Sequence, residues 1–180
     1  LRKITPELIL KVLAVPCGLT VSTPAEAQQL WQELARETDL VVQDKAGDTL
    51  RNRPDLRAEM VALFQSTDED RAKALAVHRS AVAYYELLNG PGDRAEELYH
   101  RLSAGDPREV LDRVWSPEAE RSLRASECEL PDDAKAYLAA VAQGGSGSGF
   151  EAADLSDDYW QKADLTTWER KTARWVADLI

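Results

Sequence analysis

The sequence predicts a mainly α-helical protein with one small β-hairpin in its first third. Apolar residues recur at helical spacing behind repeated helix-start signals along most of the 180 residues, which indicates amphipathic helices. The segment 40–51 departs from this pattern, because two short β-prone pieces surround a cluster of turn residues. With 44% hydrophobic and 30% charged residues, the chain has the composition of a globular protein.

Two helices are predicted at the start of the chain. Thr5 is suited to cap the first helix, Pro6 to occupy its first turn and Pro16 to end it. Thr23 and Glu26 have the T-x-x-E spacing of a capping box, which predicts the start of the second helix. The predicted apolar faces are Leu8, Ile9, Val12 and Leu13 in the first helix and Ala27, Leu30, Trp31 and Leu34 in the second.

A hairpin and a third helix are predicted next. The strands cover 40–43 and 49–51 and are joined by a turn through Asp44 and Gly47. The third helix covers the stretch "RPDLRAEMVALF". The order helix, helix, hairpin, helix is typical of a winged-helix domain, so residues 1–65 are interpreted as such a domain without its usual first helix.

Residues 66–143 are predicted to be helical. Thr67 and Asp70 form a capping box at the start of a long helix that ends near Gly90, and an Asp or Ser followed by Pro marks the start of later, shorter helices. Short helices in antiparallel pairs are typical of tetratricopeptide-like (TPR-like) proteins. A strict period of about 34 residues is not present, so we expect an irregular TPR-like array. In one of its helices the predicted inward face is Ala95, Leu98, Tyr99 and Leu102.

The chain changes character at the run "GGSGSG", residues 144–149, which we interpret as a linker or a shortened loop, natural or engineered. Residues 150–180 are predicted to form a C-terminal helical segment with an apolar stripe. This segment is expected to pack on the helical array or, alternatively, to be a fused peptide ligand. The residues assigned to this packing are Trp160, Leu165, Trp168, Trp175 and Leu179.

Composition excludes several classes of function. The net charge of −10 disfavours contact with phosphate backbones, so we expect no nucleic-acid partner. The chain has no apolar run of about eighteen residues, so we expect no membrane partner and a cytoplasmic location. Cys17 and Cys128 are expected to be reduced thiols, and His78 and His100 to be packing residues. We therefore predict no catalytic residues, no metal site and no enzymatic activity.

One stretch after the hairpin is a candidate binding site. Arg51, Arg53 and Arg57 surround Asn52, and guanidinium groups can hold a phosphate. The alternative, which the chemistry favours, is a helix start in which Arg57 pairs with Asp55 or Glu59. A winged helix can also bind DNA through its second helix, but here that helix region carries Glu26, Glu33 and Glu37 against the single basic residue Arg36, which argues for a role in protein packing.

Five segments carry further information, namely "LRKITPELILKVLAVPCGL", "LARETDLV", "LRNRPDLRAEM", "HRSAVAYY" and "AEELYHRLSAGD". Together with "ADLTTWERKTARWV", they resemble the region after the nucleotide-binding module in bacterial signal-transducing ATPases of the STAND class. The resemblance covers nearly the whole chain. It implies a P-loop ATPase core, which these 180 residues lack, followed by a winged-helix domain and helical repeats.

The resemblance also implies a role for the stretch after the hairpin. In apoptotic and plant-resistance relatives a His-Asp pair in the winged-helix domain touches the bound nucleotide. By position, Asn52 or Arg53 stands where the His would be, and Asp55 is the acidic member. ATP or ADP is implied only for the missing P-loop domain, so no cofactor is expected in this fragment.

These observations predict a non-catalytic, protein-interacting regulatory fragment of a STAND-type ATPase. It would couple the nucleotide state of the ATPase module to a sensor or effector domain, its expected protein partners. Two alternatives stay open at this point: a peptide-binding helical adaptor with residues 150–180 as its fused ligand, and a winged-helix DNA-binding regulator.

Overall fold

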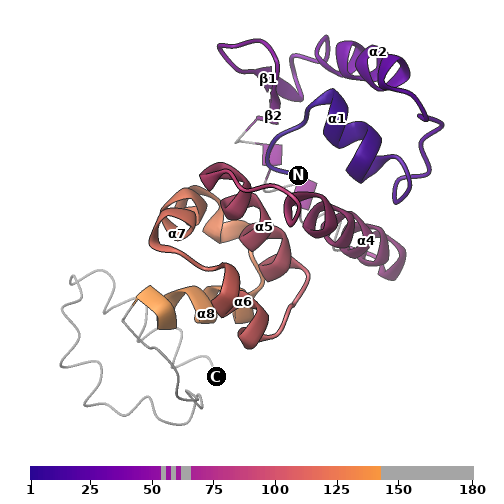
Figure 1. Ribbon diagram of the computed structural model, residues 1–180. Coiled ribbons are helices and arrows are strands. Elements are labelled where there is room, and N and C mark those ends of the chain that lie inside the picture. Colours follow the sequence, from indigo (N-terminus) through magenta and orange to yellow (C-terminus); the bar gives the residue numbers. More distant parts are fainter. Residues whose placement is uncertain (54–55, 58–59, 62–65, 143–180) are drawn as a thin grey trace, which may run out of the picture. The chain divides into compact units, whose positions relative to one another are not determined.

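The computed structural model describes residues 1–53, 56–57, 60–61 and 66–142. The chain divides into two compact units, Leu1–Ala139 and Ala140–Ile180. The first unit begins with two short helical segments and a hairpin, and a group of helices follows (Figure 1). It is mainly helical with one small antiparallel sheet, as the sequence predicts.

The first helix contains a π-helical turn that apolar spacing does not predict. It starts as α1, Pro6–Leu8, behind the expected cap, in which Leu8 N–H donates to Thr5 Oγ1 at 3.2 Å. It continues as the π-helix η1, Ile9–Leu13, and Ala14 N–H donates to the carbonyl of Ile9 at 2.9 Å. This wider turn differs from the regular helix that we predicted, and π turns are frequent at functional sites.

The second helix, α2, spans Pro24–Leu34 and starts as predicted. Glu26 N–H donates to Thr23 Oγ1 at 3.3 Å, and Thr23 N–H donates to Glu26 Oε2 at 3.0 Å, which confirms the capping box. Ala27 and Trp31 are buried, whereas Leu30 and Leu34 are half-buried against them. The predicted apolar face of α2 is therefore its inward face.

The hairpin consists of β1, Val41–Gln43, and β2, Leu50–Asn52, paired antiparallel with Val41 opposite Asn52. Its turn depends on Asp44, whose Oδ1 accepts from Gly47 N–H at 2.9 Å, while Gly47 adopts a left-handed φ of 78°. An isolated antiparallel bridge joins Ile4 to Leu50. The chain segment before α1 thus pairs with the second strand of the hairpin.

The third predicted helix, residues 53–64, is described only in part. Its described residues are Arg53 and the helical Leu56, Arg57, Met60 and Val61.

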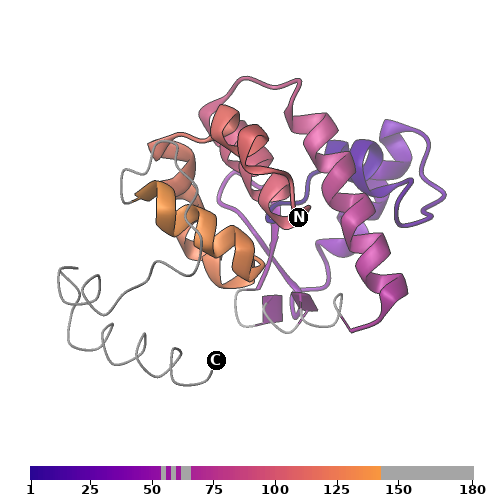
Figure 2. The ribbon, with the colours of Figure 1, turned by 90° about the horizontal axis from the view of Figure 1, so that it is seen from below.

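Helix α5 packs against α4, α6 and α7, and α4 and α5 lie side by side in both views (Figures 1 and 2). The helices of this part are α4, Asp68–Tyr85; α5, Pro91–Ser103; α6, Arg108–Val114; α7, Pro117–Leu123; the 3₁₀ segment η2, Arg124–Glu129; and α8, Asp132–Ala142.

The predicted caps of α4 and α7 are confirmed, whereas that of α6 is wrong. Thr67 Oγ1 accepts from Asp70 N–H at 3.1 Å, and Ser116 caps α7. The N-cap of α6, however, is Pro107 in place of the predicted Asp106, and its side chain makes no capping hydrogen bond. Asp106, the residue before that proline, instead accepts hydrogen bonds from two arginine side chains.

The first helix contributes to two separate apolar clusters. Ile9 packs in a hairpin-side cluster with Ala27, Trp31, Val41 and Leu50. Leu8 and Val12 pack in a helix-side cluster with Ala81 and Tyr85 of α4. The α1–η1 segment therefore lies between the hairpin part and the helical part of the unit and buries side chains against both.

Within the described part of the chain, no helix is both long and apolar enough to cross a membrane. The Gly/Ser run and the tail residues Trp160, Leu165, Trp168, Trp175 and Leu179 lie outside the described residues.

Candidate functional site

The candidate phosphate-binding stretch, residues 51–57, has its first residues in the hairpin and its last residue, Arg57, in the interior of the first unit. Arg51 is exposed on β2, and the half-buried Asn52 ends that strand opposite Val41. Arg53 N–H donates to the carbonyl of Leu40 at 3.0 Å, which extends the hairpin by one residue. Asp55, the third residue that the resemblance implies for phosphate sensing, lies outside the described residues.

Arg57 turns inward and binds groups from distant parts of the chain. Its Nε donates to Glu129 Oε1 at 2.5 Å, one terminal nitrogen donates to the carbonyl of Leu1 at 2.6 Å, and the other donates to Tyr99 Oη at 3.3 Å. Tyr99 Oη in turn donates to Glu129 Oε2 at 3.0 Å. We call Arg57, Tyr99 and Glu129 the arginine junction.

The arginine junction is buried, and the positive charge of Arg57 is paired with the negative charge of Glu129. The side chains of Arg57 and Glu129 are only 12% and 7% exposed. Burial is the largest single effect and opposes the charge of Arg57, but hydrogen bonding and electrostatic attraction to Glu129 and Tyr99 together outweigh it, so the pKa of Arg57 is raised. Burial, together with the neighbouring Glu129, raises the pKa of Tyr99 to about 12. Arg57 is thus a structural cation whose donors are used by protein groups.

The N-terminal segment packs on the same helices. Arg2 pairs with Glu96 at 3.2 Å, donates to the carbonyl of Ser122 at 2.9 Å and lies 5.1 Å from the centroid of the Tyr99 ring. Lys3 lies 5.4 Å from the centroid of the Tyr85 ring. Two cations therefore cover the aromatic side chains of α4 and α5.

Beneath these cations, two histidines meet in the interior. Nδ1 of His78 on α4 and Nδ1 of His100 on α5 are 2.9 Å apart, and His100 is fully buried. The His100 ring stacks on Tyr85, with centroids 5.9 Å apart, and meets Tyr99 edge-on at 5.2 Å. Within the described residues, His100 Nε2 and Tyr85 Oη have no hydrogen-bond partner. We call His78 and His100 the histidine pair.

Burial sets the protonation of the histidine pair. It lowers the pKa of His78 to about 4 and lowers the pKa of His100 well below its ordinary value. Both rings are therefore neutral near pH 7. A neutral imidazole has one donor and one acceptor nitrogen, so one ring donates through Nδ1 and the other accepts.

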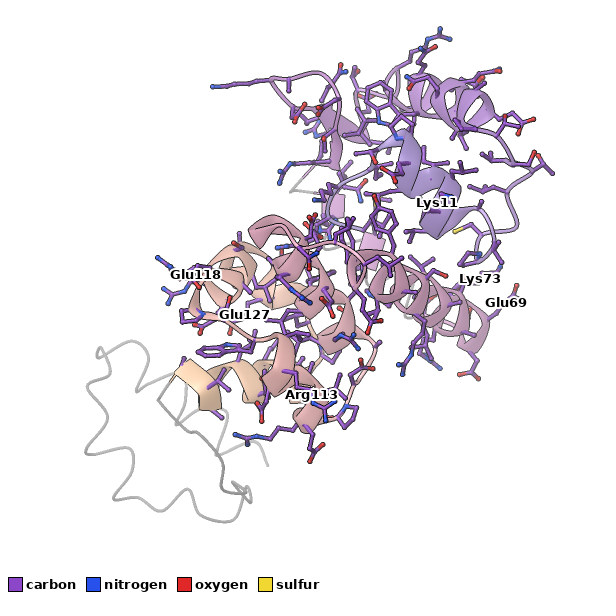
Figure 3. The ribbon with its side chains drawn as sticks, viewed as in Figure 1. Lys11, Glu69, Lys73, Arg113, Glu118 and Glu127 are labelled. Carbon is purple, nitrogen blue, oxygen red and sulfur yellow. The ribbon has the colours of Figure 1, made fainter. Side chains whose placement is uncertain are left out.

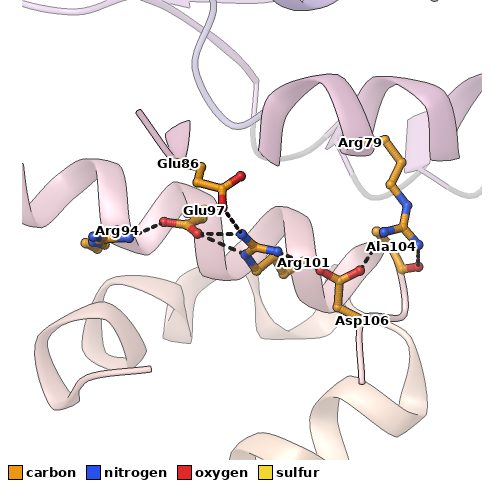
Figure 4. Close-up of polar contacts among 7 residues, drawn as sticks. All are labelled: Arg79, Glu86, Arg94, Glu97, Arg101, Ala104 and Asp106. Carbon is orange, nitrogen blue, oxygen red and sulfur yellow. Dashed lines mark hydrogen bonds and ion pairs between the residues drawn. The ribbon is translucent and has the colours of Figure 1, made fainter. Parts of the chain in front are cut away.

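A second polar network also joins α4 and α5 (Figure 4). Arg101 contacts Glu97 at 2.9 Å and Asp106 at 3.0 Å, and Arg79 of α4 reaches Asp106 at 2.7 Å. Glu97 also pairs with Arg94 at 2.6 Å. The carboxylates of Glu97 and Asp106 are almost fully buried, so this network joins α4, α5 and the α5–α6 loop through paired charges.

Charged residues on the surface are distributed over several elements (Figure 3). Lys73 pairs with Glu69 at 2.8 Å along α4. Other exposed charges are Lys11, Arg113, Glu118 and Glu127. Because charges of both signs occur on these elements, this surface differs from the clustered basic face that binds nucleic acid.

Among the described residues, His, Cys, Asp and Glu form no group of three that could hold a metal ion. Cys17 and Cys128 are both free and exposed, which agrees with the expectation of two separate thiols. Comparisons with protein families, with curated proteins and with solved structures found no match.

Sequence reasoning named Arg57, Tyr99, His78 and His100, but it did not single out Glu129, and it missed the contacts that form the arginine junction and the histidine pair. Arg57 and Glu129 are 72 positions apart, and His78 and His100 are 22 positions apart. Local spacing carries no signal for such contacts. One clue to buried polar contacts was present in the sequence of α5. Polar residues, among them Glu97 and His100, lie next to the apolar residues of its inward face.

Proposed function

We propose that the chain is a non-catalytic regulatory fragment of a STAND-type ATPase, which relays the state of an ATPase module to a sensor or effector domain. Its first part would be a winged-helix domain and its second part an irregular TPR-like array. The order bridge, helix, helix, hairpin in residues 4–52 supports the first assignment. The neighbouring α4 and α5, joined by a short connection, support the second.

The observation that carries this proposal is the α1–η1 segment, which buries side chains in two clusters. Ile9 belongs to the hairpin-side cluster, whereas Leu8 and Val12 belong to the helix-side cluster. A closely packed helix cannot move against one neighbour without changing its contacts with the other. A displacement that begins at the hairpin would therefore reach α4, as a relay between domains requires.

The arginine junction supports the same role. Arg57 follows the hairpin, and its partners Tyr99 and Glu129 lie on α5 and η2. Because both charges of the Arg57–Glu129 pair are buried, separating them without new partners costs several kcal/mol. The junction would therefore hold one arrangement until a larger driving force, such as nucleotide exchange in a neighbouring module, overcomes it.

The acidic second helix favours protein contacts over DNA. In a winged-helix domain this helix would be α2, and its exposed Glu26 and Glu33 would meet phosphates of like charge. The sequence of α2 contains no Lys or Arg to offset them.

Two experiments test the proposed function. The gene should encode a P-loop motif ahead of Leu1, and a gene without one would contradict membership of an ATPase of this class. The purified chain should hydrolyse no ATP above the buffer blank in a phosphate-release assay. Turnover that follows the protein through successive purification steps would overturn the non-catalytic assignment.

A further inference from the structure

A surface groove runs between α2 and the loop that precedes it. Its volume is about 310 Å³. Leu30 and Glu33 line it from α2, and Leu19 and Val21 line it from the loop. Leu19 is 36% exposed, so apolar surface in this groove is open to solvent.

The groove has a carboxylate near each end of its α2 wall. Glu26, Leu30 and Glu33 are spaced by four and three residues, which places them along one face of the helix. Seven residues of helix separate the two carboxylate-bearing positions by about 10 Å. Along the α2 wall of the groove, an apolar side chain, Leu30, therefore lies between two acidic side chains, Glu26 and Glu33.

Both carboxylates are held in place by local hydrogen bonds. Glu26 Oε2 accepts from the backbone N–H groups of Ser22 at 2.8 Å and Thr23 at 3.0 Å. Glu33 Oε1 accepts from Gln29 Nε2 at 3.1 Å. The hydrogen bond from the Ser22 backbone is the main cause that lowers the pKa of Glu26, so its negative charge persists into mildly acidic solution.

Fixed charges beside an open apolar surface define the complementary partner. An apolar side chain would contact Leu19, Val21 and Leu30, and a Lys or Arg on each side of it would meet Glu26 and Glu33. In a peptide with polyproline II conformation, residues three positions apart lie on the same side of the backbone and are separated by about 9 Å. A segment of the form basic, apolar, apolar, basic therefore matches both the charges and their spacing.

We propose that this groove docks a basic and apolar segment of a partner protein, in which two Lys or Arg residues flank one or two large apolar residues. The inference rests on the proposed function in one respect, that α2 serves protein contacts. It adds the chemistry of the partner and the surface that receives it.

The test is a titration of the ¹⁵N-labelled full chain followed by amide chemical shifts. The probe is the peptide acetyl-Gly-Lys-Leu-Leu-Lys-Gly-amide, and the control peptide carries Glu in place of both Lys residues. We expect saturable shifts that are concentrated in residues 19–33 with the Lys peptide, and none with the Glu peptide. The binding should weaken as salt rises, because exposed charges are screened.

Substitutions locate the binding energy. Glu33→Lys replaces the attraction between Glu33 and a Lys of the peptide, a solvent-exposed ion pair, with a repulsion between two positive charges. The dissociation constant should therefore rise about tenfold. Leu19→Gln should also weaken binding, because it removes exposed apolar surface from the groove. The control Glu127→Lys makes the same change of charge on an exposed residue near α7, away from α2, and should leave binding unchanged (Figure 3).

Several outcomes would overturn the proposal. These are the absence of shifts in 19–33 at millimolar peptide, equal shifts with the Glu peptide, or equal loss with Glu127→Lys. Shifts in 19–33 that depend on protein concentration alone would assign the groove to a second copy of the chain. Stronger shifts with duplex DNA would assign α2 to nucleic acid and would contradict the proposed function as well. Failure of the peptide alone leaves the relay through α1–η1 standing.

Discussion

His78 and His100 lie on neighbouring helices with their Nδ1 atoms 2.9 Å apart, and the contact is possible only while the pair lacks its full complement of protons. With both rings doubly protonated, two N–H donors would face each other. The surroundings add to this penalty, because Arg2 and Arg57 and the amino group of Leu1 are the nearby positive charges. Glu96 and Glu129, which pair with the two arginines, and Tyr85 and Tyr99, which contact His100, are further titratable groups near the pair.

The histidine pair predicts that acid begins to weaken the fold at a higher pH than the one at which carboxylates titrate. In the folded chain the pKa of His78 is lowered to about 4 from the ordinary 6.5, so the unfolded state binds protons first as the pH falls. Stability that is fully present above pH 6.5 is therefore lost progressively between pH 6.5 and 4, by an amount on the order of 3 kcal/mol for His78 alone. The measurement is the free energy of unfolding in urea at several pH values.

The variant His100→Phe isolates this effect. It removes one titrating ring and keeps an aromatic side chain against Tyr85. We expect a shallower loss of stability between pH 6.5 and 5 than in the unchanged chain. Identical slopes in the two proteins would mean that the histidine pair does not govern the response to acid.

The arginine junction predicts a strong and specific coupling between Arg57 and Glu129. Arg57→Leu leaves the carboxylate of Glu129 buried without its cation, which should cost about 3 kcal/mol or more in the free energy of unfolding. The double variant Arg57→Leu/Glu129→Leu removes both charges and should be more stable than Arg57→Leu. A double variant that loses the sum of the two single losses would show that the residues act independently.

The network around Asp106 predicts that the α5–α6 loop contributes to the packing of α4. Asp106→Asn removes the negative charge that Arg79 and Arg101 share, so we expect a loss of about 2 kcal/mol. The matched control is Asp68→Asn, in which the carboxylate is 98% exposed and pairs with Arg71. This control should change stability by less than about 0.5 kcal/mol. Equal losses would indicate a general effect of charge.

The capping box predicts a smaller and local effect at α2. Thr23→Ala removes the acceptor for Glu26 N–H and should cost about 1 kcal/mol. The control Thr38→Ala makes the same chemical change at an exposed position outside the helices. Both are measured by urea unfolding, and a loss for Thr23→Ala no larger than that for Thr38→Ala would show that the box contributes little.

Local features of this fold were predictable because local chemistry determines them. Thr5, Thr23 and Ser116 cap helices where a side-chain oxygen can reach a free N–H group. The hairpin strands start and end within one residue of the predicted bounds. The inward face of α5 follows from its apolar spacing.

Features that depend on distant contacts were not predictable in this way. The π turn in η1 places Ile9 and Val12 in different clusters, an arrangement set by two packing surfaces at once. Arg57 was expected to pair with a neighbour in sequence, yet the described structure joins it to Glu129 and Tyr99. Asp106 was expected to begin a helix, but two arginines that lie 5 and 27 positions earlier in the chain bind its carboxylate.

The central claim, that a disturbance of the hairpin reaches α4 through α1–η1, is tested most directly by native-state hydrogen exchange of Val41→Ala. Val41 is buried in the hairpin-side cluster, whereas its neighbour Val42 is 52% exposed, so Val42→Ala is a control with the same chemical change in the same strand. A loss of about 2 kcal/mol is expected for Val41→Ala. We predict faster exchange in both the hairpin and the α4 amides of residues 77–85, and no change for Val42→Ala. Faster exchange confined to the hairpin, with α4 unaffected, would contradict the relay.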